Sequence, residues 1–360
     1  MAVKHLLIGS LEAYSGKSAT VLGLAKSLLS KGLKISYGKP LSTFSTSAPA
    51  NGIDEDIDFL KQTLNLKDDQ LRPTVLWLDT AHLLERMQGE DQFDYQQQLT
   101  QYCDMQKSDL VILEGPSTLH QGQIFDLSLA QMAAGVDSEI VLVMRGHSPK
   151  CVDALLDAKQ RLGDRLIGVL INDIPQAQFE VFSKQVKPFL ESQQIAVLGL
   201  MPFSSLLRSV SVAELVDQLQ AEVLCCDNRL GLMVEQLTIG AMNVNSALQY
   251  FHKAVNMAVV TGSARTDLQL AALEASTQCL ILTGRFAPHA LVLNRAKDLE
   301  IPILLVDSDT LTTVEIVDRA FGQVRLHEAV KVDCIEKMFA QHFDLERLLT
   351  LLDLEPALSV

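Results

Sequence analysis

The fold of this chain is decided by residues 5–22, His-Leu-Leu-Ile-Gly-Ser-Leu-Glu-Ala-Tyr-Ser-Gly-Lys-Ser-Ala-Thr-Val-Leu, which run from an apolar strand through a polar turn into a helix. Gly16 lets the backbone fold close to an anion, Lys17 adds a mobile positive charge, and the hydroxyl of Ser18 is a ligand for Mg²⁺. The stretch therefore predicts a phosphate-binding loop in which Ser15, Gly16, Lys17, Ser18 and Ala19 bind ATP and Mg²⁺.

One position of this loop departs from the usual pattern G-x-x-x-x-G-K-[ST]. The first glycine of the pattern falls at Leu11, and Gly9 lies two residues too early. We therefore expect a loop that is wider than the standard one or turned differently, although the Gly-Lys-Ser core and its place between strand and helix remain. The alternative is a strand-to-helix turn with a purely structural role.

Length and composition point to a globular protein. The 360 residues suggest about two domains, and a content of 48% hydrophobic and 21% charged residues is ordinary for chains that form a core. No apolar run approaches the roughly 18 residues needed to cross a bilayer, and the chain enters its first strand without a signal-peptide pattern. We therefore expect a cytoplasmic protein with no membrane partner.

The net charge and the metal-binding residue types exclude several classes of ligand. A formal charge of −14 repels polyanions, so nucleic acid is excluded as a partner. A nucleotide is not excluded, because the loop amides, Lys17 and Mg²⁺ act on its phosphates at shorter range than the screened carboxylates do. The six cysteines form no C-x-x-C pair and are expected to be reduced, and the eight scattered histidines predict no zinc site.

Short apolar runs alternate with amphipathic stretches through the first two hundred residues. The runs predict strands at 5–10, 34–39, 110–114, 139–145, 166–172 and 196–201, with helices at 18–31, 54–65, 91–106, 126–135 and 150–162. Continuous apolar strands separated by helices favour an α/β fold with a parallel sheet and helices on both faces.

A second series of elements follows a region of weaker pattern. Strands are predicted at 232–239, 257–261, 279–283 and 302–306, and helices at 245–253, 266–276, 288–299 and 310–321. We therefore expect a first domain at residues 1–205, a linker at 206–228, a smaller α/β domain at 229–334, and a C-terminal helix and tail at 335–360.

Charged residues gather at the ends of the predicted strands, where ligands of parallel sheets bind. Lys39 ends the second strand and is a candidate to hold a substrate anion, the alternative being a solvated lysine before a proline turn. Asp54 and Asp56 are candidate Mg²⁺ ligands or simply favourable charges at a helix start. Glu114 ends a buried strand and is a candidate to place the metal or a water molecule. Lys17, Lys39 and Glu114 are the candidate catalytic residues.

Asn172 ends the fifth predicted strand. Its amide offers both a donor and an acceptor to a purine edge, although asparagines at strand ends commonly form turns. Its place in the order of strands favours contact with the base, so we include it among the nucleotide-binding residues.

Together these motifs resemble the dethiobiotin synthetase-like P-loop domain. They are Ser15-Gly-Lys-Ser18, Lys39-Pro40, Asp54-Glu-Asp56, Glu114-Gly115 and Gly168-x-x-x-Asn172. The likeness covers about residues 1–205 and is closest to the version at the N-terminus of long bacterial phosphate acetyltransferases. The resemblance implies a P-loop NTPase-type sheet, ATP and Mg²⁺ as ligands, and a homodimer.

The second domain resembles the DRTGG domain that accompanies this P-loop domain. The matching stretches are Gly240-Ala-Met242, residues 259–269, Ile281-Leu-Thr-Gly284 and residues 309–314. Two positions depart from the family motif: Ala264 replaces the aspartate of Asp-Arg, and Arg285 replaces the second glycine of Thr-Gly-Gly.

These departures put ligand binding by the second domain in question, because an arginine side chain prevents the closest approach of a ligand to the backbone. The candidate ligand residues that remain are Arg265, Thr266, Asp267 and Thr283. The alternative role of Thr266 is to cap a helix.

Three functions are consistent with the sequence. We favour a nucleotide-responsive regulatory or sensor module that acts on a protein partner. The second is an ATP-dependent ligase of the dethiobiotin synthetase or cobyrinic acid amide synthase type, which activates a carboxylate by phosphorylation. The third is a scaffold that binds no nucleotide. No segment resembles the catalytic domain of the long acetyltransferases, so acetyl transfer is not expected.

Overall fold

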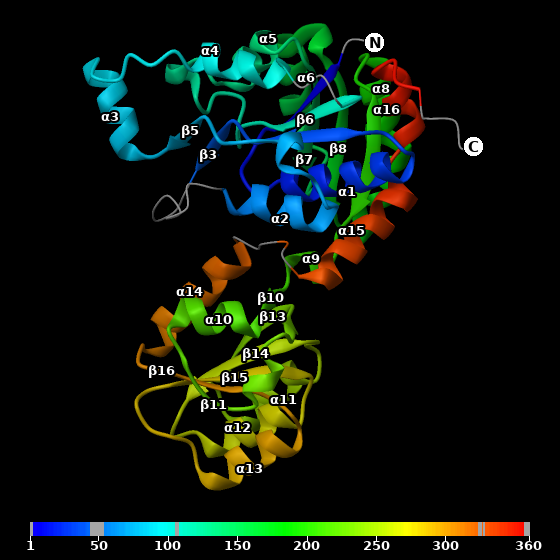
Figure 1. Ribbon diagram of the computed structural model, residues 1–360. Helices are drawn as coiled ribbons and strands as arrows, with labels where there is room; N and C mark the ends of the chain where they lie inside the picture. Colours follow the sequence, from blue (N-terminus) through cyan, green and yellow to red (C-terminus); the bar gives the residue numbers. More distant parts are fainter. Residues whose placement is uncertain (1–2, 44–53, 105–107, 323–325, 327, 356–360) are drawn as a thin grey trace. The chain divides into compact units, whose positions relative to one another are not determined.

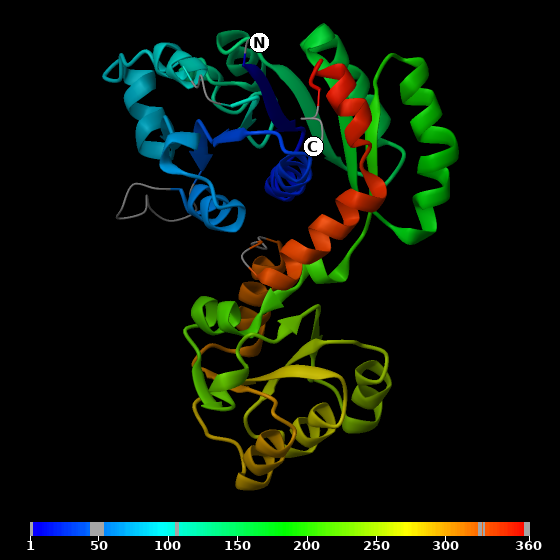
Figure 2. The ribbon, with the colours of Figure 1, turned by 45° about the vertical axis from the view of Figure 1, so that its right-hand side comes forward.

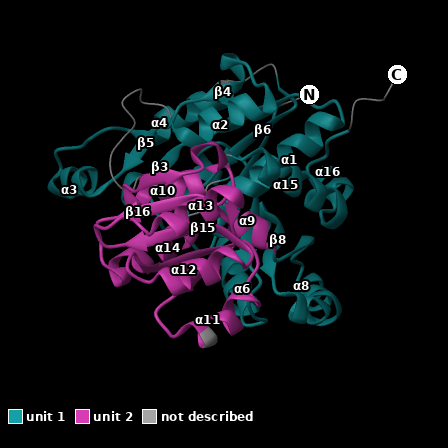
Figure 3. Ribbon diagram, turned by 90° about the horizontal axis from the view of Figure 1, so that it is seen from below, with its two compact units in different colours: residues 1–203, 326–360 teal, residues 204–325 magenta. Residues whose placement is uncertain are grey.

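The chain folds into two compact units. The computed structural model describes residues 3–43, 54–104, 108–322, 326 and 328–355. Residues 1–203 and 326–360 make up the first unit, and residues 204–325 make up the second (Figure 3).

The first unit is built on a seven-stranded sheet in which every neighbouring pair of strands is parallel. Leu6, Leu7 and Ile8 in the central strand are fully buried, as expected where helices cover both faces. The predicted α/β class with a parallel sheet is confirmed. Across the sheet the strands are β4 (Leu71–Arg72), β2 (Ile35–Gly38), β6 (Leu110–Glu114), β1 (Lys4–Ser10), β7 (Glu139–Arg145), β8 (Leu166–Ile174) and β9 (Val197–Pro202).

Helices cover both faces of this sheet (Figure 1). The core on one face joins Leu7 of β1 to Leu129 of α5 and Leu155 of α6, whereas α1 buries Leu22 and Leu28 on the opposite face. The helices between the strands are α1 (Lys17–Ser30), α2 (Glu55–Leu64), α3 (Thr80–Gln88), α4 (Tyr95–Thr100), α5 (Leu129–Gly135), α6 (Cys151–Leu162), α7 (Phe179–Val181) and α8 (Lys187–Ser192).

The helix predicted at 91–106 is wrong in its extent. The α-helix α4 occupies residues 95–100, and a 3-10 turn follows at Gln101–Asp104. The reason is the cap at Asp94, whose Oδ1 accepts a hydrogen bond from the backbone N–H of Gln97 at 2.9 Å and so fixes the first turn.

Some short elements were not predicted from the sequence. A second, two-stranded parallel sheet pairs β3 (Leu41–Thr43) with β5 (Leu76–Leu78). These strands are too short to show a reliable alternation of apolar residues. The helix predicted at 126–135 begins three residues late, because Ser128 and Gln131 form a capping box before Leu129.

The C-terminal segment returns to the first unit, where Figure 2 shows it beside the sheet. The single helix predicted within the C-terminal segment 335–360 is in fact two helices, α15 (Ala329–His342) and α16 (Leu345–Leu351). The chain breaks between them because the N–H of Asp344 bonds the carbonyl oxygen of Leu198 at 2.7 Å. The side chain of Asp344 then caps α16.

Contacts with α1 hold α15 in place. The ring of Phe339 lies so close to Gly23 that a Cβ atom there would approach its Cδ2 to 2.3 Å. Lys26 and Glu336 form an ion pair at 2.6 Å at the edge of this contact. The helix that follows the phosphate-binding loop is therefore packed against residues from the far end of the sequence.

The second unit has a five-stranded sheet in the order β11 (Glu222–Cys225), β16 (Ile303–Val306), β15 (Thr277–Thr283), β14 (Met257–Gly262) and β13 (Gln236–Ile239). The strand β11 is antiparallel to its neighbour and the other pairs are parallel. One core lies against α11 (Val244–Phe251), α12 (Thr266–Leu273) and α13 (Ala290–Asp298), and the other lies against α10 (Val212–Leu219) and α14 (Thr310–Gly322).

The expected linker at 206–228 is structured. It holds most of α9 (Ser205–Arg208), all of β10 (Val210–Ser211), and both α10 and β11 of the second unit. The strand β10 pairs with β12 (Met233–Val234). The weak pattern in this region reflects elements that are short, and the division between units lies at residue 203 rather than within a linker.

Candidate functional site

The turn from β1 into α1 has the geometry of an open phosphate-binding loop. Gly16 is the N-cap of α1 with φ 98° and ψ 24°, in the left-handed region that favours glycine. The first turn of α1 has no side-chain cap and no acidic residue, so its N–H groups remain available to an anion. The hydroxyl oxygen of Ser15 is buried and has no hydrogen-bond partner in the described part of the chain.

Lys17 is the first residue of α1 and its side chain is nearly buried, with 9% of its surface exposed. Burial lowers the pKa of its amine, which Glu114 partly offsets. None of the carboxylates that the structure describes lies within ion-pair distance of this amine. The loop therefore holds a desolvated positive charge without a direct counter-ion.

Ser18 and Glu114 meet at the carboxyl edge of the sheet. The hydroxyl of Ser18 donates to Oε1 of Glu114 at 3.0 Å, and the hydroxyl of Tyr37 donates to Oε2 at 3.1 Å. Glu114 is buried, and desolvation is the main reason that its pKa is raised, although Lys39 and Lys17 work in the opposite direction. The structure thus brings together the predicted Mg²⁺ ligand Ser18 and the predicted metal-placing carboxylate.

Lys39 is paired with the two predicted aspartates. Its amine lies 3.0 Å from Oδ2 of Asp54 and 2.5 Å from Oδ2 of Asp56. Burial alone disfavours the charged amine, but Asp56, Glu114 and Asp54 together raise its pKa above the ordinary value. Asp54 also caps α2 by accepting from the N–H of Asp56 at 2.8 Å, and it accepts a hydrogen bond from Ser42.

Asn172 lies against the loop rather than away from it. Its Nδ2 donates to the carbonyl oxygen of Ser15 at 3.0 Å. A Cβ atom on Gly16 would come within 2.2 Å of the same nitrogen. The amide therefore stabilises the loop through this hydrogen bond. Its contact with a nucleotide base remains a prediction.

Tyr37 and Ser42 are site residues that the sequence reasoning missed. Tyr37 and Lys39 are two residues apart at the end of β2, so the alternation of a strand directs both side chains to the same face. That spacing was the available signal for Tyr37. The contact of Ser42 with Asp54 depends on the path of a loop and had no comparable signal.

The candidate residues of the second unit lie where parallel strands end. The guanidinium of Arg265 donates to the carbonyl oxygen of Met242 at 2.9 Å and lies 3.5 Å from Asp267. Thr283 at the end of β15 shares a hydrogen bond with Thr310 at 2.9 Å. The N-cap of α12 is Arg265, so the alternative that Thr266 caps the helix is wrong.

The two departures from the motif have clear structural consequences. Gly284 has φ 97°, which explains why a glycine follows Thr283. Arg285, in place of a second glycine, is 81% exposed and lies 3.9 Å from Asp307. It therefore extends into solvent beside the strand ends.

Among the described residues, no three His, Cys, Asp or Glu side chains gather closely enough to hold a metal ion. Mg²⁺ is commonly held by one or two protein oxygens together with phosphate oxygens and water. Ser18 and Glu114 are oxygen donors of that kind beside the uncapped start of α1. The described helices also include none that is long and apolar enough to cross a membrane.

Comparison with known families agrees with this geometry. The model of the family described as AAA domain matches residues 4–211, more than half of the chain. The chain belongs to this family. The DRTGG domain model matches residues 214–320. The inferred combination of a P-loop domain with a DRTGG domain is confirmed, and the two matches support nucleotide binding by this chain.

The curated relatives are longer proteins. Phosphate acetyltransferase from Nitratidesulfovibrio vulgaris is 24% identical over 362 residues, which cover 94% of this chain and 50% of that protein. Phosphate acetyltransferase from Synechocystis is 24% identical over 366 residues, 96% of this chain and 51% of that protein. The chain thus spans about half the length of these relatives, consistent with the N-terminal region of long phosphate acetyltransferases.

Two solved structures resemble parts of the chain at low TM-scores. The cell division protein MinD from Aquifex aeolicus has a TM-score of 0.36 and 13% identity, covering 56% of this chain and 83% of that one. The CBS and DRTGG domains of Clostridium perfringens pyrophosphatase, complexed with the activator diadenosine tetraphosphate, have a TM-score of 0.28 and 17% identity, covering 37% and 67%. Neither likeness is close enough to carry an argument about function.

Proposed function

We propose that the chain binds Mg–ATP at the loop of residues 15–19 and works as a nucleotide-responsive regulatory module. The observation that carries this proposal is the nearly buried amine of Lys17, which has no ion-pair partner among the described residues. A desolvated charge is costly unless an anion compensates it. A triphosphate in the loop supplies that anion beside the free N–H groups of α1.

Each loop residue has a distinct role in this proposal. Lys17 neutralises the β- and γ-phosphates, and the hydroxyl of Ser15, which has no partner among the described residues, donates to a phosphate oxygen. Ser18 contributes a hydroxyl oxygen to Mg²⁺. Glu114 orients this hydroxyl through its hydrogen bond. The metal, when bound, supplies positive charge that shields the phosphates.

The regulatory role is favoured over catalysis by the state of Lys39. A ligase of the carboxylate-activating type needs a second cation for its substrate. Lys39 already has Asp54 and Asp56 within 3.0 Å and a raised pKa. The amine is therefore engaged with carboxylates of its own chain.

The ligase remains the second candidate because Lys39 lies close enough to Lys17 that its charge contributes, after burial, to the lowered pKa of the Lys17 amine. If a substrate anion displaces Asp56, both amines then face the reacting phosphate. This alternative predicts phosphate release that depends on added small carboxylates and amines.

We further propose that the chain acts as a homodimer with a protein partner in the cytoplasm. The free state of all six cysteines supports a reducing compartment. The homodimer rests on the family resemblance. Light scattering of the purified chain, with and without Mg–ATP, tests the homodimer, and a purely monomeric species in both states contradicts it.

Calorimetric titration of the full chain with ATP and ADP, with and without Mg²⁺, tests the nucleotide site. We expect Lys17→Ala to weaken ATP binding at least tenfold, about 1.4 kcal/mol. Lys184→Ala is the matched control, because Lys184 is exposed and pairs only with Glu180, four residues before it, among described residues. Unchanged ATP affinity in Lys17→Ala refutes the site, and no ATP binding by the unmodified chain leaves the scaffold as its role.

A further inference from the structure

A cleft in the first unit lies at the edge of the sheet, apart from the phosphate-binding loop. Its volume is about 490 Å³, within the range of pockets that hold small molecules. Arg72 ends the edge strand β4, and the cleft continues over the turn after β4 to α4 and the 3-10 turn behind it. The side chains that define its chemistry are Arg72, Thr74, Phe93, Gln98, Gln101 and Tyr102.

Arg72 gives the cleft a positive charge that no described carboxylate neutralises. Its Nη1 donates to the neighbouring carbonyl oxygen of Leu71 at 3.1 Å. No carboxylate in the described ranges pairs with it, although the chain as a whole carries an excess of acidic residues. A planar guanidinium in a half-open cleft is suited to a carboxylate, which it binds with two parallel hydrogen bonds.

Further polar groups in the wall are available to a ligand. The hydroxyl oxygen of Thr74 is buried and has no hydrogen-bond partner in the part of the chain described. The side-chain amides of Gln98 and Gln101 line the cleft, and neither bonds another described residue. Phe93 is 49% exposed and offers an aromatic face beside them.

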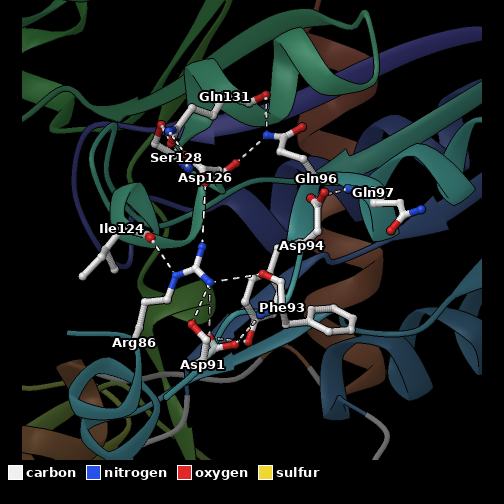
Figure 4. Close-up of polar contacts among 11 residues, drawn as sticks. Arg86, Asp91, Phe93, Asp94, Gln96, Gln97, Ile124, Asp126, Ser128 and Gln131 are labelled. Carbon is white, nitrogen blue, oxygen red and sulfur yellow. Dashed lines mark hydrogen bonds and ion pairs between the residues drawn. The ribbon is translucent and has the colours of Figure 1, made fainter. Parts of the chain in front are cut away.

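Hydrogen bonds from Arg86 hold the wall that carries Phe93 (Figure 4). The guanidinium of Arg86 donates to the carbonyl oxygens of Asp91 at 3.0 Å and Phe93 at 3.1 Å. The ring of Phe93 packs edge-on against Tyr95 at 4.9 Å between centroids. A cleft with a fixed wall loses little conformational entropy when it binds.

The cleft is linked to the nucleotide-binding edge but does not coincide with it. Arg72 pairs with Gly38 in the register of β4 and β2, and Lys39 follows Gly38 directly. The ring of Tyr102 lies over Gly38, where a Cβ atom would approach Cε1 to 2.5 Å. Because β2 and β6 separate β4 from β1, three strand spacings put about 14 Å between Arg72 and the strand that leads to the loop.

We propose that this cleft is a second ligand site that binds a small organic carboxylate with an apolar or aromatic portion. Arg72 binds both oxygens of the carboxylate, Gln98 and Gln101 donate to the remaining lone pairs of the same oxygens, and Phe93 contacts the apolar portion. The proposal is independent of the nucleotide site and stands whether or not the loop binds ATP.

Ligand-observed NMR titration of the full chain tests this proposal with benzoate and its neutral analogue benzamide, followed by acetate, pyruvate and succinate. We expect benzoate to bind at least tenfold more tightly than benzamide. Arg72→Gln keeps a polar side chain of similar reach and is expected to lose that preference. Arg161→Gln is the matched control, because this exposed arginine on α6 pairs with Asp157 of the same helix. Both variants are first checked for an unchanged thermal transition.

A second variant tests the aromatic wall. Phe93→Ala is expected to lower the affinity for benzoate while leaving that for acetate unchanged. The proposal is overturned if no carboxylate binds in the millimolar range, if Arg72→Gln binds benzoate as the unmodified chain does, or if benzamide binds equally well. Competition between Mg–ATP and benzoate also overturns it, because the cleft is then part of the nucleotide site.

Discussion

Gly16 is the residue at which the geometry of the loop is most directly tested by substitution. A non-glycine residue in the left-handed region costs about 1–2 kcal/mol, and Gly16 has φ 98°. In Gly16→Ala the new Cβ also lies 2.2 Å from Nδ2 of Asn172 and displaces that amide from the carbonyl oxygen of Ser15. The lost hydrogen bond adds about 0.5–1.5 kcal/mol. We therefore expect Gly16→Ala to lower the free energy of unfolding by about 1.5–3.5 kcal/mol.

Gly89→Ala separates the two contributions. Gly89 has φ 77° and no atom within 4 Å of an added Cβ. We therefore expect Gly89→Ala to lower the free energy of unfolding only by the backbone contribution of about 1–2 kcal/mol. Urea unfolding followed by the fluorescence of Trp77, the sole tryptophan of the chain and part of β5 in the first unit, measures both variants. Adding Asn172→Ala to Gly16→Ala is expected to cost less than the sum of the single changes, because the obstructing amide is gone. Equal losses for Gly16→Ala and Gly89→Ala, or strict additivity of the double change, refute the reasoning.

Three further predictions follow from contacts in the first unit. Tyr37→Phe removes a hydrogen bond to the buried carboxylate of Glu114, so urea unfolding is expected to show a loss of about 1.5–3 kcal/mol; an unchanged midpoint contradicts it. The two 2.6 Å hydrogen bonds from Arg347 lower the pKa of Glu191, so their stabilisation is present above the unfolded pKa of about 4.3 and is lost as the pH falls through the lowered folded value. Stability curves measured between neutral and acid pH are therefore expected to be flatter in Arg347→Gln, and parallel curves exclude this coupling. Phe339→Ala leaves a cavity where α15 meets α1, so thermal unfolding is expected to show a loss of stability of about 3–5 kcal/mol. A loss below about 1 kcal/mol would mean that the ring is not part of the core.

The sheet of the first unit was predictable because its strands are continuous apolar runs. The predicted strands at 110–114 and 139–145 coincide with β6 and β7. Such runs encode burial on both faces locally. The return of α15 and α16 was not predictable in the same way, because an amphipathic helix shows that one face is buried without showing which surface buries it.

The candidate site was predictable in its loop and less so in its electrostatics. The strand, the Gly-Lys-Ser core and the helix lie together in sequence, so Gly16, Lys17 and Ser18 follow from local rules. The pairing of Lys39 with Asp54 and Asp56 depends on how the chain folds back between β2 and α2. Charge patterns place such residues at one edge of the sheet but do not say which of them pair with one another.

The contact between α1 and α15 also determines when the first unit can finish folding during synthesis. The helix that starts at the phosphate-binding loop is covered by a segment encoded after the whole second unit. At a translation rate of about 5–20 residues per second, roughly 7–30 s pass between the appearance of β9 and that of α16. Throughout that interval the side of α1 that carries Gly23 lacks its cover from Phe339. The first unit, whose synthesis begins before that of the second, is therefore the last to complete its fold.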